Sequence, residues 1–366
     1  MEMQSKMGLL QETLESIRPL NYEMMVEAKD IWDSLTHPVG SLGQLEEMTI
    51  RLAGITGEPI SSLEKRGIVV MAADNGVYAE DVSSSPQVFS LLLSEAMARG
   101  ETGVAALAAR QKAEVVVVDI GLISDGTYDK RIRNCCIRKG TKNIANEAAM
   151  TREEAIQAIE VGISIADELF EKGFDILGTG ELGIANTTTS SAVLAAFTSA
   201  PIEDCVGLGG GITDAQLIKK RAVVRRAVAR LKGETQDVIE VLAQVGGLDI
   251  CGLVGVFLSA AKNRRPVVID GLISSVAALA AKRLHPISVD YMFASHLSKE
   301  VAAAFVLQEL CLKPLVTLDM RLGEGSGCPF TFDILDSALY AMTHMGTYDK
   351  TGITEGILVN IRDREV

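Results

Sequence analysis

The stretch Gly67-Ile-Val-Val-Met-Ala-Ala73, followed at once by Asp74-Asn75-Gly76, decides the fold class. Its apolar residues run on without polar alternation, which is typical of a strand that helices cover on both faces of a parallel sheet. The polar corner with its glycine marks the end of that strand. A parallel sheet requires further strands of the same kind.

Four more apolar runs each lead into a polar or glycine-rich corner, and Ala-rich helical stretches separate them. These runs cover residues 115–120, 174–177, 266–269 and 313–318. Strands that alternate with helices predict an α/β fold with a Rossmann-like parallel sheet flanked by helices. We expect this large domain over residues 65–330, and a small helical domain from both chain ends, residues 1–64 and 331–366. An amphipathic helix over roughly the first 25 residues is predicted by the helical spacing of Met7, Leu10, Leu14 and Ile17.

Composition excludes several classes of protein. The formal net charge of −13 over 366 residues argues against a nucleic-acid surface, which needs a basic excess. The mean hydropathy is +0.23, yet no apolar run reaches the roughly 18 residues that a membrane helix needs. The six cysteines form no C-x-x-C pair and do not combine with the four histidines at metal-ligand spacing. We therefore expect a cytoplasmic protein without a metal site, membrane anchor or nucleic-acid partner.

One corner is rich in glycine and precedes a helix. The carboxyl ends of parallel strands share one edge of a sheet, where open α/β proteins bind ligands. Gly178-Thr-Gly-Glu-Leu-Gly183 lies at such a corner, before Thr187-Thr-Thr-Ser-Ser191 opens an Ala- and Leu-rich helix. Glycines let the backbone approach an anion and a helix N-terminus adds N–H donors, which favours a phosphate cradle. A dinucleotide site, from the G-x-G-x-x-G pattern, and a structural tight turn remain alternatives.

Two further glycine-rich corners carry groups suited to chemistry. In Gly207-Leu-Gly-Gly-Gly-Ile-Thr-Asp214, Thr213 or Asp214 could cap a helix on which Lys220 reaches a phosphate, with a solvated basic face as the alternative. In Arg321-Leu-Gly-Glu-Gly-Ser-Gly327, Glu324 could be a general base or an ordinary loop acid. A lone histidine such as His296 is more often a hydrogen-bonding group than a catalyst. The absence of a G-x-S-x-G elbow from the sequence disfavours a Ser-His-Asp hydrolase.

Ten short segments follow one another in the order of a known family, and only their combination is specific. They are Leu35-Thr-His-Pro-Val-Gly-Ser-Leu-Gly-Gln-Leu-Glu46, Ala73-Asp-Asn-Gly-Val77, Val117-Val-Asp-Ile-Gly121, Gly140-Thr-Lys-Asn143, Ala149-Met-Thr-Arg-Glu-Glu154, Gly180-Glu-Leu-Gly-Ile-Ala-Asn-Thr-Thr188, Gly246-Gly-Leu-Asp-Ile250, Asp270-Gly271, Ser295-His296 and Arg321-Leu-Gly-Glu-Gly-Ser-Gly327. Together they resemble the nicotinate-nucleotide:dimethylbenzimidazole phosphoribosyltransferase family over nearly the whole chain.

The resemblance implies a reaction of cobalamin biosynthesis. Nicotinate mononucleotide would donate its ribosyl 5-phosphate to a cobamide lower base, with inversion from β to α at the anomeric carbon and release of nicotinate. It also implies that Glu324 is the general base that takes the acceptor's proton. The residues expected to hold phosphate and ribose are Gly178, Thr179, Gly180, Glu181, Gly183, Asn186, Thr187, Gly209, Gly210, Gly211, Lys220, Asp249 and Asp270. Those expected to hold the base are Ser85, Leu93, Met320, Arg321 and Leu322. No cofactor is expected.

The chain departs from the usual family pattern at several positions. Asn75 stands where a histidine is usual, Leu208 where an arginine is frequent, Ala185 where a glycine is usual, and Leu93 where a glutamine is common. A leucine cannot hydrogen-bond a ring nitrogen, which suits a phenol or p-cresol acceptor as in some paired paralogues. Dimethylbenzimidazole remains an equal alternative.

Family resemblance also bears on assembly. Members are dimers with the active site near the interface, so we expect a homodimer or a heterodimer with a paralogue. A non-catalytic or partner-dependent subunit of such an enzyme remains a competing function, as does, from the glycine pattern, an NAD-dependent dehydrogenase.

Overall fold

A six-stranded, fully parallel sheet organises the computed structural model, which describes residues 8–231, 237–353 and 358–362. The strands are β1 Arg66–Ala73, β2 Glu114–Gly121, β3 Arg133–Asn134, β4 Ile176–Leu182, β5 Val267–Ile269 and β6 Met292–Ala294. Their order is β3-β2-β1-β4-β5-β6, and every neighbouring pair is parallel. The predicted α/β fold with a Rossmann-like sheet is confirmed. The order reverses between β1 and β4, and ligands of such sheets bind at that point.

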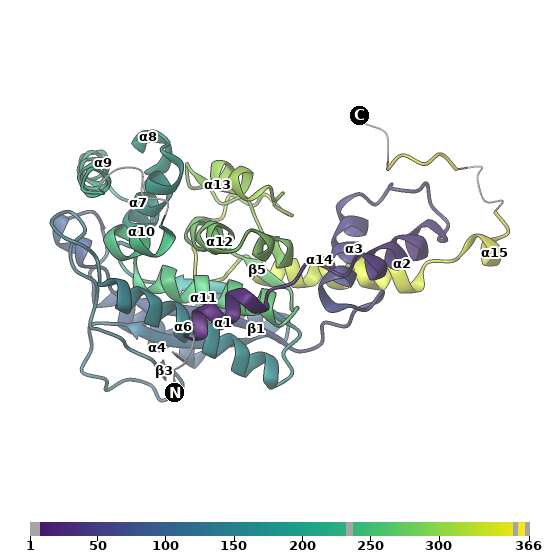
Figure 1. The fold of residues 1–366 in the computed structure, drawn as a ribbon, viewed down its shortest axis with the longest axis horizontal. Helices are drawn as coiled ribbons and strands as arrows, with labels where there is room; N and C mark the ends of the chain where they lie inside the picture. Colours follow the sequence, from purple (N-terminus) through teal and green to yellow (C-terminus); the bar gives the residue numbers. More distant parts are fainter. Residues whose placement is uncertain (1–7, 232–236, 354–357, 363–366) are drawn as a thin grey trace, which may run out of the picture.

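Helices connect and cover these strands (Figure 1). They are α1 Leu9–Ser16, α2 Tyr22–Asp33, α3 Gln44–Thr56, α4 Phe89–Arg99, α5 Gly103–Arg110, α6 Arg152–Glu171, α7 Asn186–Thr198, α8 Ile202–Cys205, α9 Asp214–Ala229, α10 Val238–Val245, α11 Leu248–Lys262, α12 Leu272–Leu284, α13 Ala303–Leu310, α14 Cys328–His344 and α15 Tyr348–Thr351, with 3₁₀ turns η1 Gly76–Glu80 and η2 Pro286–Tyr291.

Four of the six strands were predicted and two were missed. β1, β2 and β5 lie within two residues of their predicted bounds, whereas β4 starts later and runs on through the glycines to Leu182. The predicted strand over residues 313–318 is wrong, because this segment makes only an isolated bridge between Val316 and His296. β3 and β6 escaped prediction because neither has a β-branched apolar run.

Both faces of the sheet are covered, which explains why its strands lack polar alternation. Gly252 of α11 packs on Met71 of β1, where a Cβ atom at Gly252 would meet the Met71 sulfur at 2.9 Å. Ile68 lies three positions earlier in the strand and therefore points to the opposite face. On that face Cys328, at the start of α14, packs against Gly178 and Ile68.

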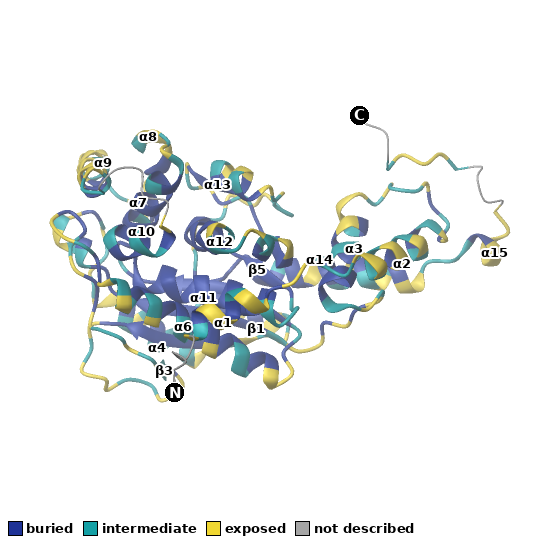
Figure 2. Ribbon diagram, in the orientation of Figure 1, coloured by how far each residue is buried: buried dark blue, intermediate teal, exposed yellow. Residues whose placement is uncertain are grey.

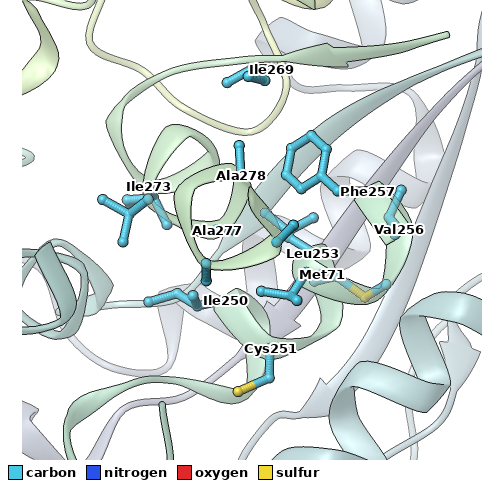
Figure 3. Packing of buried hydrophobic residues seen from close by; sticks show 14 of the residues in the cluster. Met71, Ile250, Cys251, Leu253, Val256, Phe257, Ile269, Ile273, Ala277 and Ala278 are labelled. Atoms are coloured by element: carbon cyan, nitrogen blue, oxygen red, sulfur yellow. The ribbon is translucent and has the colours of Figure 1, made fainter. Parts of the chain in front are cut away.

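The interior of the α11 layer is almost wholly apolar. Figure 2 shows the sheet with α11 and α12 buried, while exposed residues lie on the outer helices. The cluster drawn in Figure 3 includes Met71, Ile250, Leu253, Val256, Phe257, Ala277 and Ala278. At about 25 cal/mol per Å² of apolar surface, burial of these residues is the main stabilising contribution to this unit.

The N-terminal segment contains two helices and not one. α1 ends at Ser16 and α2 starts at Tyr22, with Pro19 between them and Asn21 as the N-cap that accepts the Met24 N–H. Met7, which the predicted helix also included, lies outside the described residues. α1 packs against α6 and α11, whereas α2 packs against α3 (Figure 1).

A second, smaller apolar cluster holds the helical end of the molecule together. It consists of Ala28, Trp32, Leu35, Ala53 and Met342. Helix α14 starts against the sheet, where Cys328 packs on Gly178 of β4, and runs to the α2–α3 end of the molecule, where Met342 in its last turn belongs to this cluster (Figure 1). We propose that the small helical domain centres on α2, α3 and the end of α14, with α1 attached to the large domain.

We expect Arg362→Ala to destabilise the helical end. The Arg362 guanidinium lies 2.7 Å from Asp33 and 2.7 Å from Glu46, whose side chain is only 2% exposed. Without the arginine, Glu46 retains the Leu42 N–H as a partner for its other oxygen. Leaving a buried carboxylate short of a partner should lower the free energy of unfolding by about 1–3 kcal/mol.

Urea unfolding checks this expectation, with Arg225→Ala as the control. Arg225 pairs with Glu203 and both side chains are more than half exposed, so its loss should cost under about 0.5 kcal/mol. Equal effects of the two substitutions would contradict a stabilising role for Arg362.

Candidate active site

A cavity of about 290 Å³ opens at the carboxyl ends of the strands, beside the point where the strand order reverses. The end of β4, the start of α7, the 207–212 loop, the β5–α12 corner and the 321–324 loop supply its walls. Of the residues predicted from sequence, the cavity is lined by Ser85, Leu93, Glu181, Gly183, Asn186, Thr187, Gly209, Gly210, Arg321, Leu322 and Glu324. Segments far apart in the chain therefore converge on one pocket.

Glu324 is the carboxylate best placed for proton transfer. Its side chain faces the cavity and its residue is 7% exposed. The Oε2 atom has no hydrogen-bond partner among the described residues. Burial raises the pKa of Glu324 above its ordinary value, because the charged form is poorly solvated there. A buried carboxylate with a free oxygen suits a general base.

Two further carboxylates share one amide donor. The Asn186 side-chain NH₂ donates to Glu181 and, at 3.1 Å, to Asp249. Burial, and secondarily the charge of Asp249, raises the pKa of Glu181 to about 8. Burial raises the pKa of Asp249 to about 6. Near neutral pH this pair therefore holds a proton and can still present negative charge to an electron-poor centre.

Lys220 is a buried cation beside the start of α7. It is 1% exposed, and its ammonium group donates to Thr187 Oγ1 at 2.7 Å and to the Gly207 carbonyl at 3.3 Å. Burial lowers its pKa to about 8, against a raising effect of Glu300. Helix α7 begins without a side-chain cap, and its first residues, Asn186 and Thr187, line the cavity. A buried ammonium group beside an uncapped helix N-terminus is an arrangement that suits an anion.

Four of the five residues predicted to hold the base line the cavity, namely Ser85, Leu93, Arg321 and Leu322. Val82, Leu182 and Ile184 add further apolar surface to the lining. Met320 is not part of this lining; its carbonyl accepts the Lys299 N–H at 2.9 Å. Met320, predicted for the base pocket, therefore lies outside the cavity lining, and its contact with the base stays a prediction.

Several predicted phosphate residues lie elsewhere than expected. Gly178, Thr179 and Gly180 belong to β4 and form no corner, so neither the phosphate cradle nor the tight turn at these three residues is correct. The buried Thr179 hydroxyl bonds the Val268 carbonyl and Ser274. Gly180 is required because a Cβ atom there would collide with the Glu324 carbonyl. The dinucleotide interpretation fails for the same reason, since its glycines must form the turn that opens a helix.

Other assigned residues stand behind the cavity wall. Lys220, Asp249 and Asp270 are fully or almost fully buried and do not line the cavity, but each is hydrogen-bonded to the cavity wall or its loop: Lys220 to Thr187, Asp249 to Asn186 and Asp270 to Gly325. Gly211 is exposed and also lies outside the lining. Thr213 is the N-cap of α9, with a capping box to Gln216, as predicted.

Some residues of the pocket were not assigned to it from the sequence. Ser298 and Glu300 were not predicted, and His296 was expected only as a hydrogen-bonding group; all three line the wall after β6. His296 Nδ1 bonds Ser295 Oγ at 3.0 Å, and burial lowers the histidine's pKa, which favours the neutral ring. The motif Ser295-His296 was the available signal.

Across residues 8–231, 237–353 and 358–362, no helix is long and apolar enough to cross a bilayer, and no group of three or more acidic, histidine or cysteine side chains could hold a metal ion.

Comparison with known proteins relates this pocket to one family. The family model described as Phosphoribosyltransferase matches residues 17–353. The chain is 44% identical over 359 residues to the nicotinate-nucleotide–dimethylbenzimidazole phosphoribosyltransferase of Clostridium tetani, covering 98% of this chain and 99% of the relative. It is 45% identical over 349 residues to the protein of the same name from Chloroflexus aggregans, covering 95% and 99%.

A solved structure is similar over most of its length. The crystal structure of CobT from Thermus thermophilus matches with a TM-score of 0.87 and 35% identity, covering 91% of this chain and 100% of the other.

Proposed function

The chain belongs to the phosphoribosyltransferase family of the nicotinate-nucleotide–dimethylbenzimidazole enzymes, and on that premise we propose that Glu324 is the general base in the transfer of ribosyl phosphate from nicotinate mononucleotide to an aromatic base. The chain is thus an enzyme of the phosphoribosyltransferase class. The observation that carries the proposed mechanism is the buried Glu324 carboxylate with an unpartnered oxygen in the cavity.

The proposed step balances without an added cofactor. The bond from the anomeric carbon to the pyridinium nitrogen breaks, and its electron pair neutralises that nitrogen, so nicotinate leaves without needing a general acid. The nucleophilic atom of the acceptor forms the new bond from the opposite face, which inverts the β configuration to α. Glu324 takes the acceptor's proton as this bond forms.

The remaining buried carboxylates suit the charge that develops. An oxocarbenium-like centre carries positive charge, which Glu181 and Asp249 stabilise from the Asn186 side of the cavity. We propose that Lys220, Thr187 and the α7 N-terminus bind the 5′-phosphate, with Gly209 and Gly210 of the next loop alongside. Holding phosphate and base at fixed positions aligns the attack and provides much of the rate enhancement.

An acceptor-dependence assay tests this function. The purified chain is given nicotinate mononucleotide with dimethylbenzimidazole, phenol or p-cresol, and nicotinate release is followed by chromatography. We expect release that requires an acceptor and yields an α-riboside phosphate in equal amount. Release only after a co-expressed paralogue is added would indicate a partner-dependent subunit. No release under either condition would contradict the proposed activity.

The apolar wall around Leu93 favours a phenolic acceptor. Leu93 lines the cavity and offers no hydrogen bond to a ring nitrogen, so we propose that phenol or p-cresol is accepted at least as well as dimethylbenzimidazole. A phenolic acceptor has no ring nitrogen that needs a hydrogen bond, so it loses nothing in a pocket that offers none.

We expect Leu93→Gln to shift acceptor preference toward dimethylbenzimidazole by about tenfold, the value of one hydrogen bond of about 1.4 kcal/mol. The ratio of kcat/KM for p-cresol and dimethylbenzimidazole measures this. Leu92→Gln is the control, because Leu92 is 48% exposed and outside the cavity wall. A wild-type chain that accepts dimethylbenzimidazole alone would contradict the phenolic proposal.

Half-exposed apolar side chains at the cavity support the expected association into a dimer. Leu208 is 48% exposed and Leu322 is 56% exposed, although both line the cavity. Apolar surface left open at a functional site is typical of an interaction face. Native mass measurement distinguishes a homodimer from a chain that pairs only with a paralogue.

A further inference from the structure

The loop that carries Glu324 has an unfavourable backbone conformation. Gly323, Glu324 and Gly325 have φ angles of 81°, 64° and 88° in succession. Glycine adopts such angles readily, but a glutamate in the left-handed region costs free energy. A conformation of this kind persists only where surrounding contacts impose it.

Asp270 makes the contacts that hold the loop in this left-handed conformation. Its Oδ2 accepts the Gly325 N–H at 2.9 Å, and its Oδ1 accepts the Gly327 N–H at 2.6 Å. The two amides belong to the first and third residues after Glu324. Both carboxylate oxygens are thereby engaged by the loop, and Asp270 is 3% exposed.

Asp270 is itself fixed to the sheet. It follows β5 directly, and its backbone N–H donates to Ser274 Oγ at 3.2 Å. The Ser295 hydroxyl after β6 donates to the Asp270 carbonyl at 3.1 Å. Ser274 is in turn bonded to Thr179 of β4 at 2.6 Å. The carboxylate therefore links the Glu324 loop to three adjacent strands.

We propose that Asp270 is a positioning residue, which holds the Glu324 loop in its left-handed turn so that the Glu324 carboxylate faces the cavity. This inference rests on the proposed function of Glu324. It replaces the expectation that Asp270 binds ribose or stabilises the reacting centre, because both of its oxygens face the loop and the residue does not line the cavity.

The geometry separates this role from direct binding. Asp270 is 3% exposed and does not line the cavity, so ribose bound in the cavity would not contact its side chain. The His296 ring nitrogen Nδ1 is 3.8 Å from Asp270 Oδ1, too far for a hydrogen bond. The side chain therefore acts on the reaction through the loop and not through the substrate.

A double-mutant cycle between Asp270 and Glu324 tests the proposal. In Asp270→Asn the side-chain NH₂ takes the place of one carboxylate oxygen. Because an NH₂ group cannot accept from a backbone N–H, the loop loses its hydrogen bond at Gly325 or Gly327. We expect kcat to fall by about 10- to 100-fold, with KM for nicotinate mononucleotide within about threefold. In the Glu324→Gln background the same change should cost less than about threefold, because residues that act as one unit are not additive.

Two outcomes would overturn the proposal. A full additional loss in the Asp270→Asn/Glu324→Gln double variant would show that Asp270 acts independently of Glu324. A raised KM with unchanged kcat would show that Asp270 binds substrate. Full activity of Glu324→Gln alone would instead refute the proposed function, so the two failures are distinguishable.

Matched variants control for folding. Asp119 is equally buried and accepts the Leu122 N–H and the Tyr128 hydroxyl, both at 2.7 Å, near the end of β2. Asp119→Asn should leave kcat within about threefold. If Asp270→Asn does not fold, Ser274→Ala replaces it, since it removes the hydroxyl that anchors Asp270; unchanged kcat in that variant would overturn the proposal.

Discussion

We expect the Glu324→Gln variant to release nicotinate about 10²- to 10⁴-fold more slowly than the unmodified chain, the usual contribution of a positioned proton acceptor. Glutamine has almost the same shape and fills the same space in the cavity wall, so nicotinate mononucleotide should still bind. It cannot accept a proton, and the acceptor base must then lose its proton to water. Steady-state kinetics with saturating acceptor measure the change as a fall in kcat with little change in KM.

The pH profile gives an independent check on Glu324. Burial raises the pKa of Glu324, and the base works only when deprotonated, so activity should fall as the pH drops through that raised pKa. The glutamine variant should lose this acidic limb. Glu203→Gln, at an exposed surface ion pair, should keep both the rate and the profile. An acidic limb that survives in Glu324→Gln would assign it to another group.

Replacing Lys220 by methionine should raise KM for nicotinate mononucleotide by about 10²-fold. Methionine keeps the apolar length of the side chain but removes the charge that a phosphate would pair with. Hydrogen bonds to charged groups contribute about 1.5–3 kcal/mol, which corresponds to about 10- to 150-fold in affinity. The change should appear in KM more than in kcat, because the phosphate is remote from the bond that breaks.

The neighbouring residue provides the control for this prediction. Lys219 is exposed and pairs with Asp81 at 2.6 Å, so Lys219→Met should leave KM within about twofold. Burial lowers the pKa of Lys220 to about 8, so in the free enzyme its charge is present below that pH and lost above it. KM should therefore rise above about pH 8 in the unmodified chain and stay flat in Lys220→Met. Equal effects at positions 219 and 220 would refute the phosphate assignment.

Much of the fold could be predicted from local pattern. Residues 67–73 have no polar alternation, and the structure covers that strand on both faces, with Met71 under α11 and Ile68 under α14. The strands that were missed lack a β-branched apolar run: β3 is Arg133-Asn134 and β6 is Met292-Phe-Ala294, whereas the similarly short β5 is Val267-Val-Ile269. Residues 313–318 have the composition of a strand, but they pair with the chain only at the bridge between Val316 and His296.

Some residues of the candidate site could be predicted from local pattern and others could not. Glu324 could be predicted because glycines flank it, and Lys220 because a glycine-rich corner and a helix cap precede it. The function of Gly180 could not be predicted, since it depends on the Glu324 loop packing against β4. Asp270 was recognised as a site residue, but its bonds to Gly325 and Gly327 cross more than fifty positions of the chain. Contacts at that separation leave no pattern in a single sequence.

A crystal structure of the chain with nicotinate mononucleotide, without an acceptor, decides whether Glu324 and Lys220 have the proposed roles. We expect the phosphate at about 2.8 Å from the Lys220 ammonium group, near the start of α7. The anomeric carbon should face the Glu324 carboxylate, with space for a flat aromatic ring between them against Leu93 and Leu322. A nucleotide bound outside this cavity, or bound with its anomeric carbon turned away from Glu324, would contradict these roles.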